Sequence, residues 1–224
     1  MGSLTAPEHR PAPLWLDISL WSVDLANFER EIQRLEPLAD SFHIDACDGH
    51  YAPALLFFPD LVARLRQLTL IPFHLHLMAT RPLDLLDSFL DAGVDRVTVP
   101  VETGKRAWQV MERVAARGKS RGISFELDTP EDWVKPFRQT VDTVVMMGTA
   151  MGIKGAGLDP RACDRVTAMK SLLDAHPIRL VCDGGIRRET VPLLRASGAD
   201  GIVPGSLICA SKDAVTDAAW LKGL

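Results

Sequence analysis

Eight short apolar runs rich in Val, Ile, Leu and Phe alternate with amphipathic stretches, and this alternation continues from Trp15 to the end of the chain. Such runs are typical of buried strands, while apolar residues at helical spacing are typical of amphipathic helices. The sequence therefore predicts strands near residues 14–20, 41–47, 72–78, 96–99, 122–127, 143–147, 178–182 and 201–204. It predicts helices near residues 25–35, 60–67, 82–92, 105–117, 130–139, 160–175, 187–197 and 213–221.

Strands that are each followed by a helix favour an α/β fold, here a single (β/α)₈ TIM barrel over residues 14–224. In that fold the reactive groups lie at the carboxyl ends of the strands. Several predicted helices have proline in the first turn, where it fits, as at Pro82, Pro130 and Pro160. An open doubly wound sheet is the alternative, but no Gly-x-Gly-x-x-Gly motif follows the first strand.

Composition narrows the expected partners and location. A net charge of −4 without a basic patch argues against nucleic acid as a partner. No apolar run approaches membrane-spanning length, and residues 1–13 are Pro-rich without an apolar core, so we expect a flexible lead-in and not a signal peptide. The four cysteines are scattered without metal-type or disulfide-type spacing, which indicates a reducing compartment. The sequence thus predicts a soluble, cytoplasmic protein without a membrane partner.

The second predicted strand carries an imidazole and a carboxylate on one face. Side chains alternate along a strand, so His43 and Asp45 point to the same side, about 7 Å apart along the backbone. Asp183 directly follows the seventh predicted strand, and His76 stands late in the third. Because the carboxyl ends of all strands meet at one rim of a barrel, we expect these four residues to lie together.

Two imidazoles and two carboxylates suit a divalent ion such as Zn²⁺, with Mn²⁺, Fe²⁺ and Co²⁺ as alternatives. Asp45 and Asp183 are also suited to proton transfer on opposite sides of a substrate carbon, while the metal polarises a carbonyl. The structural alternative is a hydrogen-bonded core histidine and an aspartate that caps a helix. That alternative accounts for each residue singly but less well for all four together.

The neighbouring polar and sulfur-containing residues have less specific interpretations. His74 shares the face of the third-strand ligand but lies one layer deeper, so we expect a hydrogen-bonded core residue and not a fifth ligand. His50 follows a turn and is expected on the surface or in a lid. Cys47, Met78 and Met147 either form an apolar wall around the metal or pack in the core.

Three glycine-rich turns follow the late strands, at Gly184-Gly185, Gly205-Ser206 and Gly152 to Gly157. Such turns leave backbone N–H groups accessible, and barrels commonly bind phosphate after strands seven and eight. A phosphorylated small molecule is therefore the expected ligand. Lys154 adds a cation to this ligand site, unless it is simply a solvated loop lysine.

From Leu16 to Ser206 the chain resembles the ribulose-phosphate 3-epimerases. Four segments of the chain are similar to patterns of this family. Ile18–Asp24 is similar to Pro-Ser-Ile-Leu-Ser-Ala-Asp, and His43–His50 is similar to His-Ile-Asp-Val-Met-Asp-Gly-His. His76–Met78 matches His-Leu-Met, and Val181–Ile186 is similar to Val-Asp-Gly-Gly-Ile. Gly205-Ser206 falls where the family binds phosphate. Together these motifs are highly specific.

The resemblance implies a TIM barrel of the ribulose-phosphate-binding type and a metal-dependent 3-epimerase, an isomerase of carbohydrate metabolism. It implies metal ligation by His43, Asp45, His76 and Asp183. Asp45 would accept the proton and Asp183 donate one in one direction, with the roles exchanged in reverse. With the two methionines included, the expected substrate contacts are Ser19, His76, Met78, Met147, Gly152, Ile153, Lys154, Gly155, Gly184, Gly185, Ile186, Gly205 and Ser206.

The segments that shape the substrate site depart from the family pattern. The sixth loop, Asn- or Glu-Pro-Gly-Phe-Gly-Gly-Gln in the family, is Ala150–Ala156 here, and Glu126–Pro130 replaces Asn-Pro-x-Thr-Pro. Cys47, Ala54 and Phe58 replace a methionine, an asparagine and a glycine. The identity of the sugar is therefore left open. One alternative is the pentose phosphate pair, D-ribulose 5-phosphate and D-xylulose 5-phosphate, and the other is a related ketose phosphate such as an allulose 6-phosphate.

Two other functions are open at this point. A metal-dependent barrel hydrolase would use further late-strand histidines, and the fifth, sixth and eighth predicted strands have none. A non-catalytic barrel that binds a sugar phosphate would keep the glycine turns without needing the four-residue cluster. A phosphate-binding decarboxylase is disfavoured, because Cys47 stands where that reaction needs a lysine. Trp21 and Leu55–Phe58 indicate either a lid or a subunit interface, and we expect a homo-oligomer.

Overall fold

A computed structural model describes residues 12–224. The predicted flexible segment, residues 1–13, lies outside this range except for its last two residues. Within the described part, no helix is long and apolar enough to cross a membrane.

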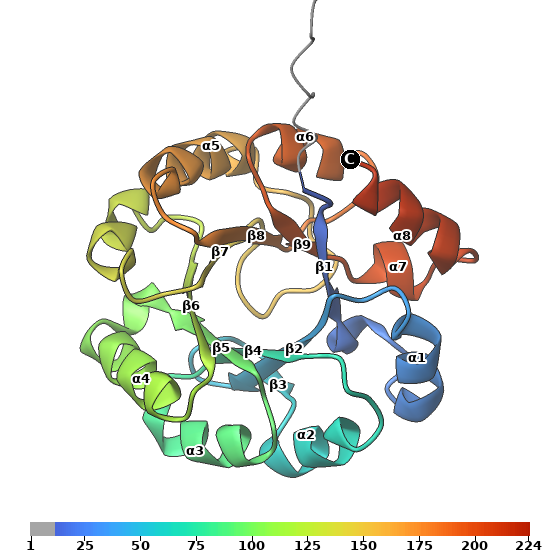
Figure 1. Ribbon diagram of the computed structural model, residues 1–224, viewed down its shortest axis with the longest axis horizontal. Coiled ribbons are helices and arrows are strands. Elements are labelled where there is room, and N and C mark those ends of the chain that lie inside the picture. Colours follow the sequence, from blue (N-terminus) through green and yellow to red (C-terminus); the bar gives the residue numbers. More distant parts are fainter. Residues whose placement is uncertain (1–11) are drawn as a thin grey trace, which may run out of the picture.

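A closed parallel barrel forms the centre of the molecule, as predicted (Figure 1). The sheet has nine strands, and all except the short β3 (Leu55–Leu56) form the ring. The open-sheet alternative is wrong, because β1 pairs in parallel with both β2 and β9. In ring order the strands are β1 Trp15–Ser19, β2 Ser41–Asp48, β4 Phe73–Met78, β5 Arg96–Pro100, β6 Ser120–Phe125, β7 Thr143–Met147, β8 Arg179–Asp183 and β9 Gly201–Val203.

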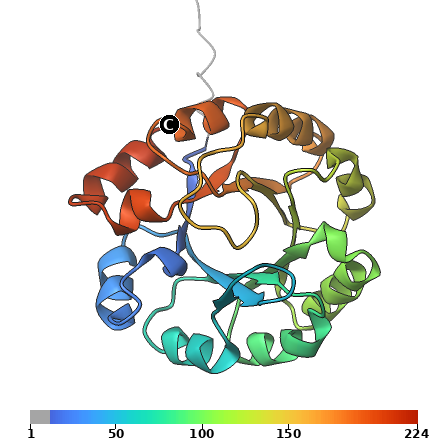
Figure 2. The same ribbon diagram turned by 180° about the vertical axis from the view of Figure 1, so that it is seen from behind.

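Helices surround the barrel on its outside (Figures 1 and 2). Amphipathic stretches form them, because each has one apolar face to bury against the sheet. They are α1 Phe28–Leu35, α2 Pro59–Arg66, α3 Leu83–Asp91, α4 Lys105–Ala116, α5 Ala162–Leu173, α6 Val191–Ala196, α7 Ser206–Cys209 and α8 Ala214–Lys222. The described part of the chain also has three 3₁₀ segments, namely η1 Leu20–Ser22, η2 Val101–Thr103 and η3 Glu131–Phe137.

Two predicted helices differ from the structure. The stretch 130–139 was expected to be an α-helix, but it forms the 3₁₀ segment η3, which contains Pro136. Proline lacks the N–H that an α-helix needs at this position. The stretch 187–197 is helical only over α6, because the turn from Gly185 to Thr190 occupies its first part.

Alternation along the strands separates two environments. In β2, Phe42, Ile44 and Ala46 face the helices and belong to the large apolar core, whereas His43 and Asp45 face the barrel interior. Burying the outward-facing side chains stabilises the fold by about 2 kcal/mol each, so a shift by one residue would be costly. This parity fixes which polar groups lie inside the barrel.

The register of neighbouring strands then sets the height of each polar group inside the barrel. Asp45 pairs with His76 across β2 and β4, and His43 pairs with His74 one layer below. On the other side of the ring, Met147 of β7 pairs with Asp183 of β8. Asp45, His76 and Asp183 therefore lie near the carboxyl ends of their strands, at the rim where barrels place their reactive groups.

Candidate active site

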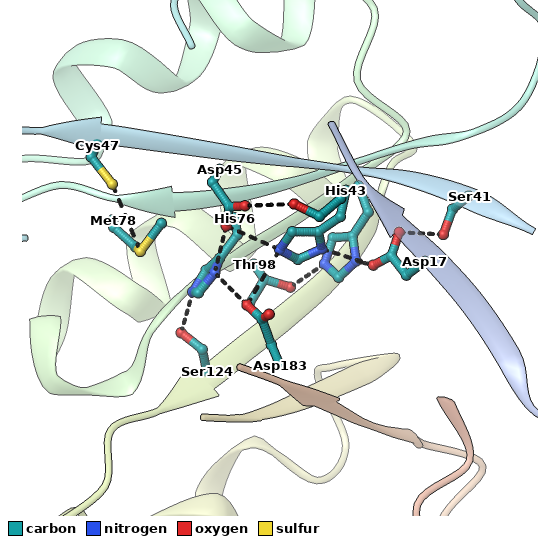
Figure 3. Close-up of polar contacts among 12 residues, drawn as sticks. Asp17, Ser41, His43, Asp45, Cys47, His76, Met78, Thr98, Ser124 and Asp183 are labelled. Carbon is teal, nitrogen blue, oxygen red and sulfur yellow. Dashed lines mark hydrogen bonds and ion pairs between the residues drawn. The ribbon is translucent and has the colours of Figure 1, made fainter. Parts of the chain in front are cut away.

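The structure brings together the four residues that the sequence singles out, from β2, β4 and β8 (Figure 3). His43 Nε2 lies 3.3 Å from Asp45 Oδ1 and 3.7 Å from Asp183 Oδ2. His76 Nδ1 lies 3.6 Å and 3.8 Å from the same two oxygens. One ligand atom from each residue lies within 4.8 Å of the other three, so a single ion fits among them.

The bonding of the two imidazoles supports a cation at this point. His43 Nε2 and His76 Nδ1 are buried and have no hydrogen-bond partner among residues 12–224. Their other ring nitrogens are held, His43 Nδ1 by Asp17 at 2.8 Å and His76 Nε2 by Ser124 at 2.9 Å. An unsatisfied buried polar atom costs about 1–3 kcal/mol, and metal-ligating histidines typically bind the ion through one nitrogen while the other is hydrogen-bonded. The donor set therefore fits a divalent metal.

The two carboxylates have opposite electrostatic environments. Burial alone would raise the pKa of Asp45, but His43 and His76 outweigh it and hold this pKa well below its usual value. Burial raises the pKa of Asp183 to about 6, although His43 acts in the opposite direction. In the metal-free protein Asp45 is therefore held in the ionised form that can accept a proton, and Asp183 is more readily protonated and can donate one, a division typical of acid–base pairs.

Asp17 of β1 contacts the cluster through His43, a contact that sequence reasoning missed. It is fully buried, and its Oδ2 lies 2.8 Å from His43 Nδ1 and 2.5 Å from His74 Nδ1. Ser41 donates a hydrogen bond to its other oxygen. Because Asp17 holds Nδ1 of His43, the opposite nitrogen of that ring faces the cluster (Figure 3). The available signal was a carboxylate at an inward position of an otherwise apolar strand.

His74 is the hydrogen-bonded core residue that the sequence predicts. Its second nitrogen bonds the hydroxyl of Thr98 at 2.7 Å, so neither nitrogen is free for a metal. Burial lowers the pKa of His74 to about 4, although Asp17 acts in the opposite direction. Because of this low pKa, the ring is neutral at pH 7. Gly122 makes room for this arrangement, since a Cβ there would lie 2.1 Å from Thr98 Oγ1.

A cavity of about 840 Å³, including its open mouth, lies beside the cluster. Asp45 and Asp183 line it, whereas His76, an expected substrate contact, is fully buried and does not. The other predicted contacts do line it, namely Ser19, Met78, Met147, Gly152, Ile153, Lys154, Gly155, Gly184, Gly185, Ile186, Gly205 and Ser206. Sequence reasoning missed Trp21, Ser22, Thr149, Ala150, Ala156, Arg187 and Val203.

Close packing explains part of the glycine pattern. Gly184 and Gly185 have φ values of +86° and +69°, and a Cβ on Gly184 would lie 2.3 Å from Thr149 Oγ1. A Cβ on Gly152 would likewise lie 2.8 Å from the Cβ of Ala52. The loop between β7 and α5 therefore lies directly against the segments after β8 and β2, and it curls across the barrel in both views (Figures 1 and 2).

The segment after β2 is also held at Tyr51. Its hydroxyl donates a hydrogen bond to Glu126, and its N–H donates one to Asp48 at 2.8 Å. His50 is exposed beside it, which confirms one of its two expected positions, the surface. Cys47 Sγ lies 3.9 Å from Met78 Sδ in a small buried apolar cluster that includes Met147. Both methionines line the cavity, whereas Cys47 only packs in the cluster.

A parallel barrel with a metal-type cluster and a cavity at the carboxyl ends of its strands has the architecture of a TIM-barrel enzyme. A model of the ribulose-phosphate 3-epimerase family matches residues 15–209. The chain therefore belongs to this family, whose members are carbohydrate epimerases, a class of isomerases.

Individual relatives agree with this assignment. The chain is 34% identical to a ribulose-phosphate 3-epimerase of Rhodobacter capsulatus over 191 residues, which cover 84% of this chain and 82% of the relative. It is 33% identical to that of Treponema pallidum, with 84% and 88% covered. A cytoplasmic isoform from Oryza sativa subsp. japonica is 31% identical, with 85% of each chain covered.

Solved structures with the same fold are more distant in sequence. A 3-keto-L-gulonate-6-phosphate decarboxylase of Vibrio cholerae superposes with a TM-score of 0.71 at 15% identity, covering 94% of this chain and 95% of that one. A 3-hexulose-6-phosphate synthase gives 0.66 at 15% identity, with 94% and 98% covered. At this identity the likeness shows the shared barrel fold alone.

Zn²⁺ is expected to bind more tightly as the pH rises. The raised pKa values of His43 and Asp183 mean that both hold protons in acid, and an ion has to displace them. The apparent affinity should increase about tenfold per pH unit for each proton that has to be displaced. Asp183 contributes to this increase up to about pH 6, and His43, whose pKa is raised above the usual histidine value, continues to contribute at higher pH. Chelator competition measures the affinity, and an indicator dye in weak buffer measures the protons released. The exposed His50→Gln variant is the control, and a pH-independent affinity would contradict the assignment.

Asp17→Asn should weaken Zn²⁺ binding about 10-fold to 100-fold, because the amide no longer anchors His43 as a carboxylate does. The matched control is Asp40→Asn, which neutralises a carboxylate that accepts from the N–H of Leu16 and from Lys222 but contacts no histidine. Chelator competition on both variants measures the effect, with urea unfolding as a check of the fold. Wild-type affinity in Asp17→Asn would show that this carboxylate has only a packing role.

Proposed function

We propose that the protein is a metal-dependent 3-epimerase of a ketose phosphate. D-ribulose 5-phosphate and D-xylulose 5-phosphate, or a related pentulose or hexulose phosphate pair, are the proposed substrates. The observation that carries the proposal is the convergence of Asp45 and Asp183 on the same two imidazoles, beside an open cavity. Membership of the epimerase family supports the reaction class.

His43, Asp45, His76 and Asp183 are the proposed metal ligands, with Zn²⁺ as the expected ion and Mn²⁺, Fe²⁺ or Co²⁺ as alternatives. When bound, such a cation polarises the substrate carbonyl and so lowers the free energy needed to remove a proton from the adjacent carbon. The orphaned nitrogens of the two histidines support these ligand roles. Asp17 and Ser124 keep the two rings in the required orientation.

Proton transfer is assigned to the two aspartates. In one direction Asp45 removes the proton from C3, which gives an enediolate, and Asp183 delivers a proton to the opposite face of that carbon. The product is the C3 epimer, and the step leaves Asp45 protonated and Asp183 ionised, so the reverse reaction exchanges the two roles. The low pKa of Asp45 and the raised pKa of Asp183 in the metal-free protein favour this assignment of acceptor and donor.

Three glycine turns line the same cavity, and they support a phosphorylated substrate. Gly184-Gly185, Gly205-Ser206 and the loop from Gly152 to Gly155 all contribute to its wall. Positive φ values at Gly184 and Gly185 turn consecutive backbone units in a way that suits an anion. Only C4, C5 and an ester oxygen separate C3 of a pentulose 5-phosphate from phosphorus, so one cavity accommodates both ends.

Asp45→Asn and Asp183→Asn should each lower kcat by about 10² to 10⁴, since each removes one proton-transferring group. The metal-loaded protein is incubated with D-ribulose 5-phosphate in D₂O, and NMR follows deuterium at C3 and formation of the epimer. The wild-type protein is expected to give both, and the exposed Asp60→Asn variant serves as the control.

The same experiment separates the alternative functions. Phosphate release without deuterium exchange would favour a hydrolase, and binding without either reaction would favour a non-catalytic barrel. Either result with the wild-type protein would contradict the proposed epimerase. A decarboxylase is not supported, because Cys47 packs against Met78 at the position where a lysine is needed.

We also propose a homo-oligomer and a cytoplasmic location. Leu55 and Phe58 are 82% and 59% exposed, which supports an interface between copies of the chain, whereas Trp21 lines the cavity. Leu55→Glu should lower the apparent mass in sedimentation velocity, and an unchanged mass would contradict this interface.

The proposed cytoplasmic location is supported by the four free cysteines, which suit a reducing compartment.

A further inference from the structure

Both acidic and basic side chains line the cavity. Its lining includes only two carboxylates, Asp45 and Asp183, and two cations, Lys154 and Arg187. The carboxylates belong to the proposed proton-transfer cluster. The cations lie on the loops that follow the neighbouring strands β7 and β8. The cavity therefore combines an acid–base pair with side-chain positive charge.

Arg187 follows the glycine turn directly, and its position is fixed by short-range bonds. Its N–H donates to Thr190 Oγ1 at 2.9 Å, and the hydroxyl of Thr190 donates to the carbonyl of Gly185 at 2.8 Å. The guanidinium uses Nη1 to bond the carbonyl of Ile186 at 3.0 Å. Within residues 12–224 this is its one side-chain hydrogen bond, and a guanidinium has five N–H donors. Most of its donors are therefore available to a ligand.

Lys154 supplies a second cation from the loop after β7. Its Nζ donates to the carbonyl of Trp21 at 2.9 Å and lies 5.5 Å from the centroid of the Trp21 ring. An ammonium group has three donors, so this bond leaves two for a ligand. Lys154 thereby connects two loops that both line the cavity.

Neither cation has a carboxylate partner among the described residues, although nearby arginines do. Arg188 lies 2.6 Å from Asp217, and Arg161 lies 3.0 Å from Asp159. Lys154 and Arg187 instead present their charge to a cavity that holds no other cation. An arginine fork with free donors is well suited to a phosphate, which accepts several charge-assisted hydrogen bonds.

We propose that Arg187 is a specificity-determining residue, which selects phosphorylated over unphosphorylated ketoses by pairing with the phosphate dianion, and that Lys154 assists it. This inference rests on the proposed function and adds the residue that discriminates the substrate class. Arg187 is four residues beyond Asp183, so the same strand end supplies the proton donor and the phosphate contact. Binding of the phosphate then helps to position C3 between the two aspartates.

The first test uses inorganic phosphate as the probe and needs no turnover. Isothermal titration of the metal-loaded protein should show phosphate binding that Arg187→Gln weakens about tenfold or more, because a charged hydrogen-bonding partner is lost. Arg187→Lys, which keeps the charge, should retain more of the affinity. Lys154→Gln should weaken binding by a smaller factor, about threefold, since its side chain is exposed.

Arg188→Gln is the matched control, because it removes the adjacent arginine, which pairs with Asp217 and does not line the cavity. It should bind phosphate as the wild-type protein does. Thermal unfolding and Zn²⁺ affinity of each variant show whether its fold and metal site are intact. Equal weakening in Arg187→Gln and Arg188→Gln would reduce the effect to surface charge and overturn the proposal.

The second test compares substrates. Arg187→Gln should lower kcat/KM for D-ribulose 5-phosphate about tenfold or more, while kcat/KM for D-ribulose should change less than about twofold. Equal losses for both sugars, wild-type phosphate affinity in Arg187→Gln, or no phosphate binding by the wild-type protein would each overturn the proposal. If phosphate binding depends on Arg187 but no epimerisation occurs, the anion site stands and the proposed reaction fails.

Discussion

The site depends on the two-sided bonding of one buried imidazole, that of His43. Asp17 holds its Nδ1 from below at 2.8 Å, and Nε2 faces Asp45 and Asp183 above. Asp45 and Asp17 outweigh burial and raise the pKa of His43, so an ion has to displace a proton from this ring. The neutral imidazole that results has one donor and one acceptor nitrogen, and the carboxylate at Nδ1 then directs the lone pair of Nε2 toward the cluster. The orphaned nitrogen would destabilise a protein that had no use for it, which is the physical reason to assign an ion there.

Closure of the barrel is what makes this bonding achievable. In the ring, β1 and β9 lie between β8 and β2. Closure of the sheet brings Asp183 of β8 into the same cluster as Asp45 of β2. An open sheet with the same strands would hold the two carboxylates on distant parts of one surface. Strand parity then turns Ile44 and Leu75 toward the helices and leaves the inside of β2 and β4 to their polar residues. The chemistry thus follows from topology and alternation together.

The alternation of strands and helices was sufficient to predict the barrel and the four clustered residues, since both follow from periodicity and from where strands end. Asp17 was missed although it is a carboxylate at an inward position of an otherwise apolar strand, because a single aspartate in a strand has many explanations. Arg187 was missed because the direction of a side chain in a turn depends on bonds such as that of Thr190. The apolar pattern at residues 130–139 predicted an α-helix, and the proline at position 136, which is incompatible with one, was not given enough weight.

The contact between Gly152 and Ala52 has a consequence for changing the sugar that the protein accepts. The loop after β7 differs most from the family pattern, so it is the natural segment to randomise in an engineered library. Ala52 leaves no space for a side chain at position 152, and Gly155 has open space around it but a φ of +83°, which residues with a side chain rarely adopt. A library that varies these two glycines would spend much of its diversity on members whose loop is strained or displaced from the barrel. Diversity is better placed at the positions between them, with both glycines held constant.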